Sequence, residues 1–416
     1  MTSWLLRLAA PLSAVLGASV LFAGAAEADR VSDDRSGVEK DVIVLCELVR
    51  SHYAYYEARE TVWEAACRKG LEWARRQTAQ TPAGHLDLLE GMLDQLYDNH
   101  VSLSVNSADS PRLVPSGSDY HVEMSNGAVV VTAVRAGSGA ARAGLAVGDR
   151  VTALNGVPVL SAAMRRMMVK RNTISEARLE WALNAQAAGY RDQPRRVTVQ
   201  RDGNAFELDL GPTATREADT RLTVRRLDGD VGYIRFEDSL GQQDAVTAFN
   251  EALEALRGVD GWILDLRNTP GGGNTGVAEP VLARFIRGVK PYQRTGPRWH
   301  EDPVRRVASR GPWRARGRVA VLVGRWTGSM GEGMAVGFDG MRRGRVFGSE
   351  MAGLAGGIES FDLPASGYSV RFPTYNLMHL DGTDRHLWRP PEPVLADNGN
   401  GEDLALETAL DWVAKR

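Results

Sequence analysis

Short apolar runs rich in β-branched residues alternate with helix-like segments through the second half of the chain. Strands are predicted at residues 231–236, 262–266 and 319–323, and helices at 245–256, 330–341 and 404–413. This alternation predicts an α/β core, because each helix can return the chain to begin the next strand beside the last one. The 416 residues exceed what one hydrophobic core normally organises, so we expect further domains ahead of this core and a multidomain α+β protein.

Residues 1–28 predict a secretory signal peptide. Arg7 is followed by an uncharged run over residues 8–23 and by the small-residue pattern Ala26-Glu27-Ala28, so cleavage is expected after Ala28. A retained membrane anchor is the alternative, but this run is shorter than the roughly 20 apolar residues that a span needs. We therefore expect an exported protein, periplasmic or extracellular, with no membrane span once the signal is removed.

Residues 29–108 predict a small helical domain, since apolar residues recur there at helical spacing. Cys46 and Cys67, the two cysteines of the chain, both fall in it and would meet an oxidising compartment after export. A disulfide between neighbouring helices is one expectation. Two buried thiols remain the alternative, because the sequence does not fix the distance between the two residues.

Residues 116–211 predict a small β-rich domain with two characteristic turns. A β-branched run at 129–132 precedes a small-residue stretch that ends in the turn Gly148-Asp149, and Asn155-Gly156 follows. The pattern resembles a PDZ domain, and an unrelated small β-domain is the alternative. The resemblance implies that the domain captures a protein or peptide substrate by its C-terminus, as an added strand whose carboxylate is held by backbone amides.

Ser329 stands between a predicted strand and a predicted helix, at the helix N-terminus. Glu332 follows three residues later, so the pair has the pattern of a capping box in which the hydroxyl only satisfies an unpaired amide. A catalytic serine is the other interpretation of the same position. The local pattern alone does not decide between the two.

A second motif, over residues 265–274, is a strand that runs into the glycine-rich loop Thr269-Pro270-Gly271-Gly272-Gly273. Gly271, Gly273 and Gly276 satisfy the spacing of a dinucleotide fingerprint, but the unit comes late in the chain and lacks the acidic residue expected about 20 positions later. A phosphate-binding loop would need a lysine, which is missing here. Backbone N–H groups that face developing negative charge, as in an oxyanion hole, fit the loop better.

Together these motifs and residues 348–353 resemble the core of the C-terminal processing, or tail-specific, serine peptidases, over residues 212–416. The resemblance implies a crotonase-like α/β core with Ser329 as the nucleophile. One branch of this family pairs the serine with a lysine about 25 residues later, but Lys415 is the only lysine after Ser329. The other branch, similar to the tricorn protease core and to interphotoreceptor retinoid-binding protein repeats, uses a histidine ahead of the PDZ domain, which corresponds to His100.

The resemblance implies a role for each of a small set of residues. His100 would act as general base, because the ordinary pKa of histidine lies near working pH. Asp384 matches the third position and would support the imidazolium. Asn99 stands where the tricorn-like pattern has a serine beside the histidine, and would orient the ring. Backbone amides of Gly272 and Met330 would hold the oxyanion.

The resemblance implies no cofactor and no metal. A metal site is the less favoured interpretation of His379, Asp381, Asp384 and His386, because they match no recognised zinc spacing. The formal net charge of −2 does not indicate a nucleic-acid-binding protein. The sequence thus predicts an exported serine endopeptidase that acts by Ser-His acyl transfer, with a catalytically inactive peptide- or apolar-ligand-binding protein of the same fold as the alternative.

Overall fold

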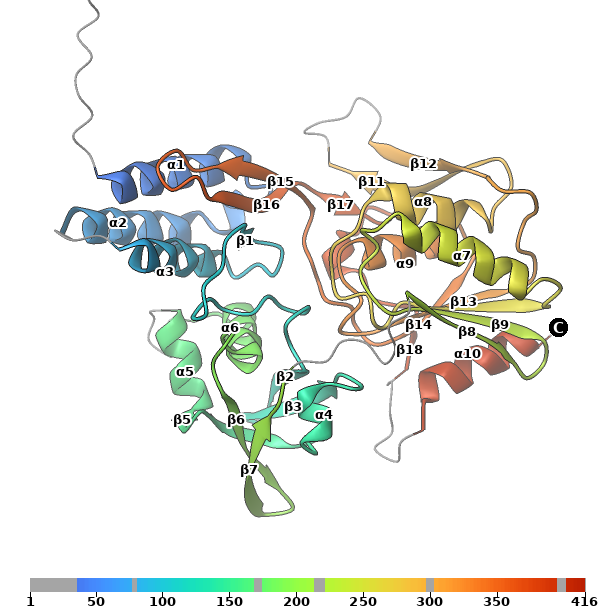
Figure 1. The fold of residues 1–416 in the computed structure, drawn as a ribbon, viewed down its shortest axis with the longest axis horizontal. Coiled ribbons are helices and arrows are strands. Elements are labelled where there is room, and N and C mark those ends of the chain that lie inside the picture. Colours follow the sequence, from blue (N-terminus) through green and yellow to red (C-terminus); the bar gives the residue numbers. More distant parts are fainter. Residues whose placement is uncertain are drawn as a thin grey trace, which may run out of the picture. The chain divides into compact units, whose positions relative to one another are not determined.

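The computed structural model describes residues 36–76, 81–167, 174–212, 221–296, 303–394 and 402–415 (Figure 1). The predicted signal peptide, residues 1–28, lies outside them. No helix in the described ranges is both long enough and apolar enough to cross a membrane. Along the chain a helical region, a β-rich region and an α/β core follow one another, which confirms the predicted mixed fold class.

The helical region is completed by a hairpin from much later in the chain. Its helices are α1 (Gly37–His52), α2 (Glu60–Arg76) and α3 (Pro82–Leu93). Its strands are β1 (Ser102–Leu103), β15 (Gly357–Asp362) and β16 (Ser369–Tyr375), which form a sheet in the order β1-β16-β15. Phe372 of β16 is buried with Trp63 and Leu89 in one apolar core. The hairpin therefore ties the C-terminal part of the chain to the first helices (Figure 1).

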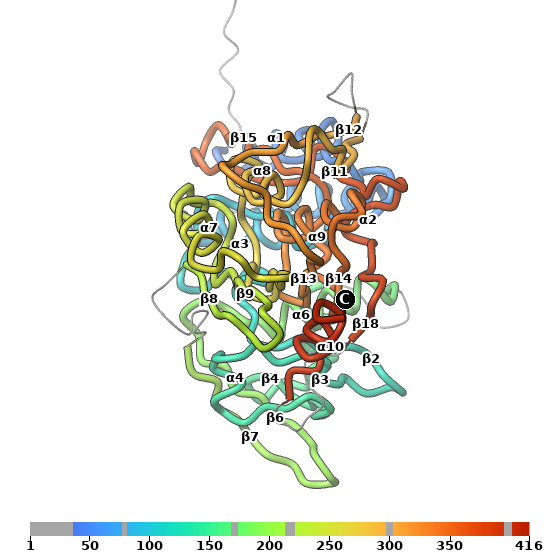
Figure 2. Tube along the Cα trace, turned by 90° about the vertical axis from the view of Figure 1, so that its right-hand side faces the viewer, coloured from blue at the N-terminus to red at the C-terminus, as the bar shows by residue number. Residues whose placement is uncertain are grey.

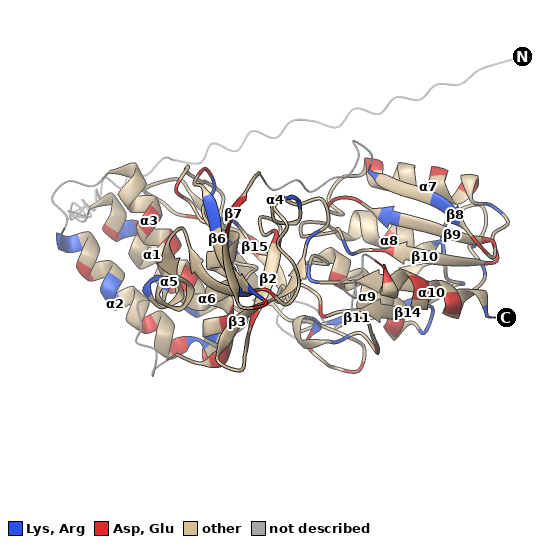
Figure 3. Ribbon diagram, turned by 90° about the horizontal axis from the view of Figure 1, so that it is seen from below, with Lys and Arg blue, Asp and Glu red and all other residues tan. Residues whose placement is uncertain are grey.

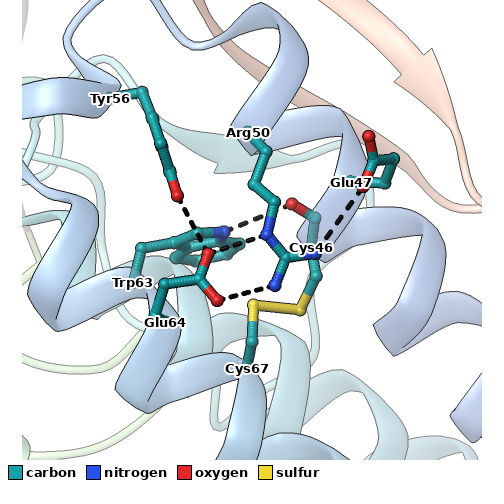
Figure 4. The surroundings of a disulfide bond; sticks show 7 residues. All are labelled: Cys46, Glu47, Arg50, Tyr56, Trp63, Glu64 and Cys67. Carbon is teal, nitrogen blue, oxygen red and sulfur yellow. Dashed lines mark hydrogen bonds and ion pairs between the residues drawn. A yellow bond between two sulfur atoms is a disulfide. The ribbon is translucent and has the colours of Figure 1, made fainter.

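Cys46 of α1 and Cys67 of α2 are joined by a disulfide (Figure 4). Their Cα atoms are 6.0 Å apart, and both residues are buried. The Arg50 guanidinium forms two hydrogen bonds of 2.7 Å with the Glu64 carboxylate beside it. The indole N–H of Trp63 donates to the Cys46 carbonyl at 3.4 Å. The disulfide thus lies within a contact network that joins the first two helices.

The β-rich region is a sheet in the order β2-β3-β4-β6-β7 with helices packed on it. Its strands are β2 (Tyr120–Ser125), β3 (Ala128–Val134), β4 (Arg150–Leu154), β6 (Arg195–Arg201) and β7 (Asn204–Leu210). Its helices are α4 (Gly139–Arg142), α5 (Val159–Arg166) and α6 (Glu176–Ala188). Strand β2 is an edge strand, and the side chain of Asn184 on α6 bonds both the N–H and the carbonyl of Val122, each at 2.9 Å.

The α/β core contains a six-stranded sheet in the order β18-β14-β13-β10-β9-β8. Its strands are β8 (Leu222–Leu227), β9 (Val231–Phe236), β10 (Gly261–Asp265), β13 (Val319–Val323), β14 (Arg345–Gly348) and β18 (Glu392–Pro393). All neighbours pair in parallel except β8 with β9. A smaller sheet, β12-β11-β17, consists of β11 (Val289–Thr295), β12 (Val304–Ala308) and β17 (Leu377–Met378).

Helices cover both faces of the six-stranded sheet (Figure 2). On one face lie α7 (Asp244–Ala255), α8 (Thr275–Ala283) and α9 (Met330–Gly340), and on the other lies α10 (Leu404–Ala414). Side chains alternate between the faces: Leu264 and Val321 belong to the core under α7–α9, whereas Ile263 and Leu322 belong to the core under α10. Burial on both faces explains why these strands are continuous apolar runs.

The parallel register brings two loops to one edge of the sheet. Ile263 of β10 pairs with Ala320 of β13, and Asp265 pairs with Leu322. Both strands therefore end at the same level. The glycine-rich loop follows β10, and the turn that leads into α9 follows β13.

Candidate active site

Ser329 occupies a sharp turn between β13 and α9. Its backbone has φ 51° and ψ −108°, a conformation that residues other than glycine rarely adopt. Backbone strain of this kind concentrates at functional sites, and a sharp strand-to-helix turn is a known way to expose a nucleophilic hydroxyl. The sequence pattern predicts the position of Ser329 at the helix N-terminus but does not indicate this conformation.

The loop after β10 holds this turn in place. The backbone N–H of Gly328 donates to the Thr269 carbonyl at 2.8 Å, and the Thr327 hydroxyl donates to the Leu266 carbonyl at 2.8 Å. Only glycine fits at position 328, because a Cβ there would lie 2.7 Å from the Pro270 carbonyl oxygen. The glycine-rich loop and the turn therefore form one packed unit.

Glu332 is fully buried beneath the turn and binds three backbone N–H groups. Its carboxylate accepts from Ser329 at 2.7 Å, from Gly353 at 3.0 Å and from Leu354 at 3.2 Å. Burial raises the pKa of Glu332 to about 7. The capping box expected from the sequence is present, and Glu332 also fixes a second stretch of backbone beside it.

His100 lies next to Ser329, although 229 positions separate them in the chain. The distance from Ser329 Oγ to His100 Nε2 is 3.2 Å, and His100 Nδ1 lies 2.6 Å from the carbonyl oxygen of Ala355. Because a carbonyl oxygen only accepts, this contact assigns the ring proton to Nδ1 and leaves the Nε2 lone pair facing the hydroxyl. Burial lowers the pKa of His100 to about 4, so the ring is neutral at neutral pH.

Asp98 supports the backbone of His100. Its carboxylate accepts from the His100 N–H at 2.8 Å and from the Tyr53 hydroxyl at 2.8 Å, and burial raises its pKa. Asn99 is the residue predicted to orient the ring, whereas these contacts to the His100 backbone and to Tyr53 come from its neighbour Asp98. An aspartate side chain often accepts a hydrogen bond from the backbone N–H two residues later, which forms a local turn. This spacing could have pointed to Asp98.

Ala355, whose carbonyl contacts the histidine, is held from both sides. The buried guanidinium of Arg385 donates from Nη2 to the Leu354 carbonyl at 3.1 Å and to the Gly356 carbonyl at 3.2 Å. Glu332 binds the same loop through two backbone N–H groups. One buried carboxylate therefore connects the turn of the serine with the loop that orients the histidine.

Asp384, predicted as the third member of the site, does not meet the histidine ring. Its carboxylate lies 3.5 Å from the side-chain amide of Asn376. In the described part of the chain the ring of His100 bonds to Ser329 and to loop backbone at Ala355, and not to Asp384 or to Asn99. A main-chain carbonyl thus stands where a carboxylate was expected, because the loop delivers it to Nδ1.

Gly272 and Met330, the predicted oxyanion donors, lie on adjoining loops. The backbone at Gly272 has φ 73°, and that at Gly273 has φ 139°. A Cβ on Gly273 would lie only 2.7 Å from the Cβ of Met330. Among the described residues, neither the N–H of Gly272 nor that of Met330 has a hydrogen-bond partner. Both groups are therefore free to bind an oxygen of a ligand beside the serine.

His379 forms ion pairs with two carboxylates, and in the described ranges it does not share a metal-sized cluster with Asp381, Asp384 and His386. His379 lies 3.2 Å from Asp339 and 3.0 Å from Asp381, and hydrogen bonding to Asp339 is the main cause of its raised pKa. Within the described ranges, the ligand atoms that come close enough to share a metal belong to His121, Glu123 and Glu180. Arg325 already pairs with one of these carboxylates, which competes with such a use.

Comparison with known proteins identifies two regions of the chain. Residues 230–389 match peptidase family S41, and residues 130–172 match the PDZ domain. A carboxyl-terminal-processing protease from Synechocystis sp. is 34% identical over 151 residues. That match covers 34% of this chain and 30% of the relative, so the chain matches less than a third of the relative's length.

Solved structures share the fold over most of the chain. The photosystem II D1 C-terminal processing protease has a TM-score of 0.54 at 18% identity, and the match covers 91% of this chain and 97% of that one. Mature CPAF has a TM-score of 0.59 at 14% identity, and the match covers 86% and 92%. At these identities the likeness concerns the fold alone.

Proposed function

Because residues 230–389 belong to peptidase family S41, we propose that this chain is a serine endopeptidase that cleaves protein substrates by acyl transfer. It acts outside the cytoplasm after removal of residues 1–28, on substrates whose C-terminal or unstructured segments are recruited by the PDZ domain. The observation that carries the proposal is the 3.2 Å approach of Ser329 Oγ to the unprotonated Nε2 of His100.

In the acylation step, Ser329 Oγ attacks the scissile carbonyl carbon while His100 Nε2 takes the hydroxyl proton. The carbonyl oxygen becomes an oxyanion, which the N–H groups of Gly272 and Met330 stabilise. The imidazolium then donates its proton to the leaving amine as the C–N bond breaks, and an acyl-serine remains. A water that is deprotonated by the same imidazole hydrolyses this ester and restores both residues.

The low pKa of His100 has two consequences for this mechanism. The base is unprotonated and available at neutral pH, but it accepts a proton with little driving force. Its imidazolium is supported by the Ala355 carbonyl instead of a carboxylate. The oxyanion donors must therefore supply a large share of the transition-state stabilisation. Stabilisation by such donors is usually the largest single contribution in acyl transfer.

Contacts between the PDZ region and the serine turn support delivery of substrate to the site. Trp326 precedes the serine by three residues, and its indole N–H donates to the Ser118 carbonyl, just before β2, at 3.0 Å. A peptide would add to the free edge of β2, where it would replace the bonds that Asn184 makes with Val122.

Hydrolysis of paired peptides tests the proposal. The two peptides share one unstructured sequence, and one ends in a free carboxylate whereas the other ends in an amide. We expect the purified chain to cleave both, with kcat/KM at least about tenfold higher for the free carboxylate, because backbone amides would hold that charge. Cleavage that persists in Ser329→Ala would contradict the peptidase assignment. Equal kcat/KM values for the two peptides would contradict recruitment through the PDZ domain but would leave the peptidase assignment standing.

A further inference from the structure

A cavity lies at the end of the core sheet opposite to Ser329. Trp262 stands at the beginning of β10 and lines it, whereas Ser329 follows the end of the parallel strand β13. The cavity measures about 720 Å³. The connections α7–β10, α8–β11 and β12–β13 form its walls. In Figure 1 the last of these connections descends at the right of the core, beside the C-terminal end of α7.

Arginine supplies every charged side chain that lines this cavity. The five arginines are Arg257, Arg287, Arg310, Arg314 and Arg316, and no aspartate or glutamate lines the cavity. Acidic and basic residues are mixed over the rest of the molecule (Figure 3), in keeping with a net charge of −2. Within the described ranges, the side chains of all but Arg257 form neither a hydrogen bond nor an ion pair. These four arginines are exposed, and their guanidinium groups lack a partner among the described residues.

Two further arginine side chains lie close to the residues that line this cavity. Arg343 is held by backbone carbonyls, and burial together with the nearby charge of Arg314 lowers its pKa to about 10. Arg284 is buried under Gly311, and its Nε and Nη2 atoms have no hydrogen-bond partner. Like charges gathered in this way repel one another. A multiply charged anion bound in the cavity would reduce this repulsion.

The cavity also offers a fixed aromatic wall. The ring centroid of Trp313 lies 5.3 Å from Arg257 Cζ and 5.2 Å from Arg284 Cζ, and its indole N–H is bonded to Glu254. Such stacking with arginine and the bond to the indole hold the ring in place. Trp313 accordingly adds an aromatic side chain to the lining, next to the charged groups.

We propose that this cavity binds a phosphate-bearing ligand. A single carboxylate carries one charge and would neutralise one of the four unpartnered arginines, whereas a phosphate or diphosphate carries several charges and three or more acceptor oxygens. Guanidinium groups match this geometry with paired hydrogen bonds. The phosphate belongs either to a small soluble molecule or to the headgroup of an anionic lipid, since both present the same group to the same arginines.

Binding of inorganic pyrophosphate and of lipid vesicles tests the proposal on the full-length chain. Calorimetry at fixed salt measures pyrophosphate, and co-sedimentation compares phosphatidylcholine vesicles with vesicles that also contain phosphatidylglycerol. The test variant is Arg310→Gln/Arg314→Gln. The matched control is Arg150→Gln/Arg165→Gln, which removes the same charge from exposed positions of the β-rich region. Both variants should retain the peptidase activity of the wild type.

We expect the test variant to bind pyrophosphate, anionic vesicles or both at least about tenfold more weakly than the control variant, because two charge-assisted contacts are lost. Selective loss of pyrophosphate binding assigns a soluble phosphate, and selective loss of vesicle binding assigns a lipid headgroup. The proposal is overturned if neither probe binds, if both variants weaken binding equally, or if polyglutamate binds the wild type as tightly as pyrophosphate does.

Discussion

Ser329 Oγ and His100 Nε2 lie 3.2 Å apart, and the proton on the far side of the histidine ring is held by the Ala355 carbonyl. The histidine comes from the end of the helical region, and the serine comes from the turn between β13 and α9. Two residues from different regions thus meet only in the folded chain.

The pH dependence of hydrolysis should report the lowered pKa of His100. Burial lowers that pKa from 6.5 to about 4, and protonated histidine cannot accept the serine proton. In Glu332→Gln, where position 332 no longer titrates near pH 7, activity is therefore retained as the pH falls from 7 to 5.5, and kcat/KM declines with a midpoint of about 4. Circular dichroism at each pH serves as the control for unfolding. A midpoint near 6.5 in the folded enzyme would show that the base is not the buried His100.

Glu332 should matter for both activity and stability. Replacement by alanine leaves three buried or part-buried N–H groups without their acceptor and releases the serine turn from the 353–354 backbone. We expect Glu332→Ala to lower kcat/KM by about 100-fold or more and to reduce the free energy of unfolding by about 3 kcal/mol.

The matched control for this substitution is Glu359→Ala, at an exposed position of β15. In steady-state kinetics and urea unfolding, this control should have a kcat/KM and a free energy of unfolding close to those of the wild type. Glu332→Gln keeps one acceptor oxygen, so its kcat/KM and its free energy of unfolding should lie between those of the two alanine variants. If Glu332→Ala matched Glu359→Ala in both measurements, the proposed link between the serine turn and the histidine loop would be wrong.

The role of Asp384 in supporting the imidazolium is still a prediction, and the geometry limits its size. Because His100 Nδ1 contacts the Ala355 carbonyl, Asp384→Asn should lower kcat by less than about tenfold. If a triad carboxylate were bonded to the base, its replacement by the amide would lower kcat by about 10⁴-fold. Rates measured beside Ser329→Ala distinguish the two cases. A loss close to that of Ser329→Ala would show that Asp384 reaches the ring during turnover.

Regular elements could be predicted from the sequence because their patterns are local. The helix predicted over residues 245–256 is α7 (Asp244–Ala255), and the strand predicted over 319–323 is β13 (Val319–Val323). Apolar periodicity suffices for such segments. The serine turn was also local, since a strand, a glycine and a helix follow one another there.

Contacts that depend on tertiary folding could not be predicted in this way. The Ala355 carbonyl has no side-chain chemistry that would mark it in a sequence, yet it orients His100. The conformation of Ser329, with φ 51°, is imposed by the packed loop around it and not by its residue type. The resemblance implies a carboxylate at the third position, whereas the atom that contacts His100 Nδ1 in the fold is a backbone carbonyl oxygen.

Covalent labelling of Ser329 tests the central claim most directly. A fluorophosphonate reacts with a serine only when a base and an oxyanion site activate its hydroxyl. Peptide mapping by mass spectrometry should find the adduct on Ser329 in the wild type, no adduct in Ser329→Ala, and labelling slowed by at least about 100-fold in His100→Ala. An unlabelled wild type, or equal labelling of the wild type and Ser329→Ala, would contradict the account and favour a catalytically inactive binding protein.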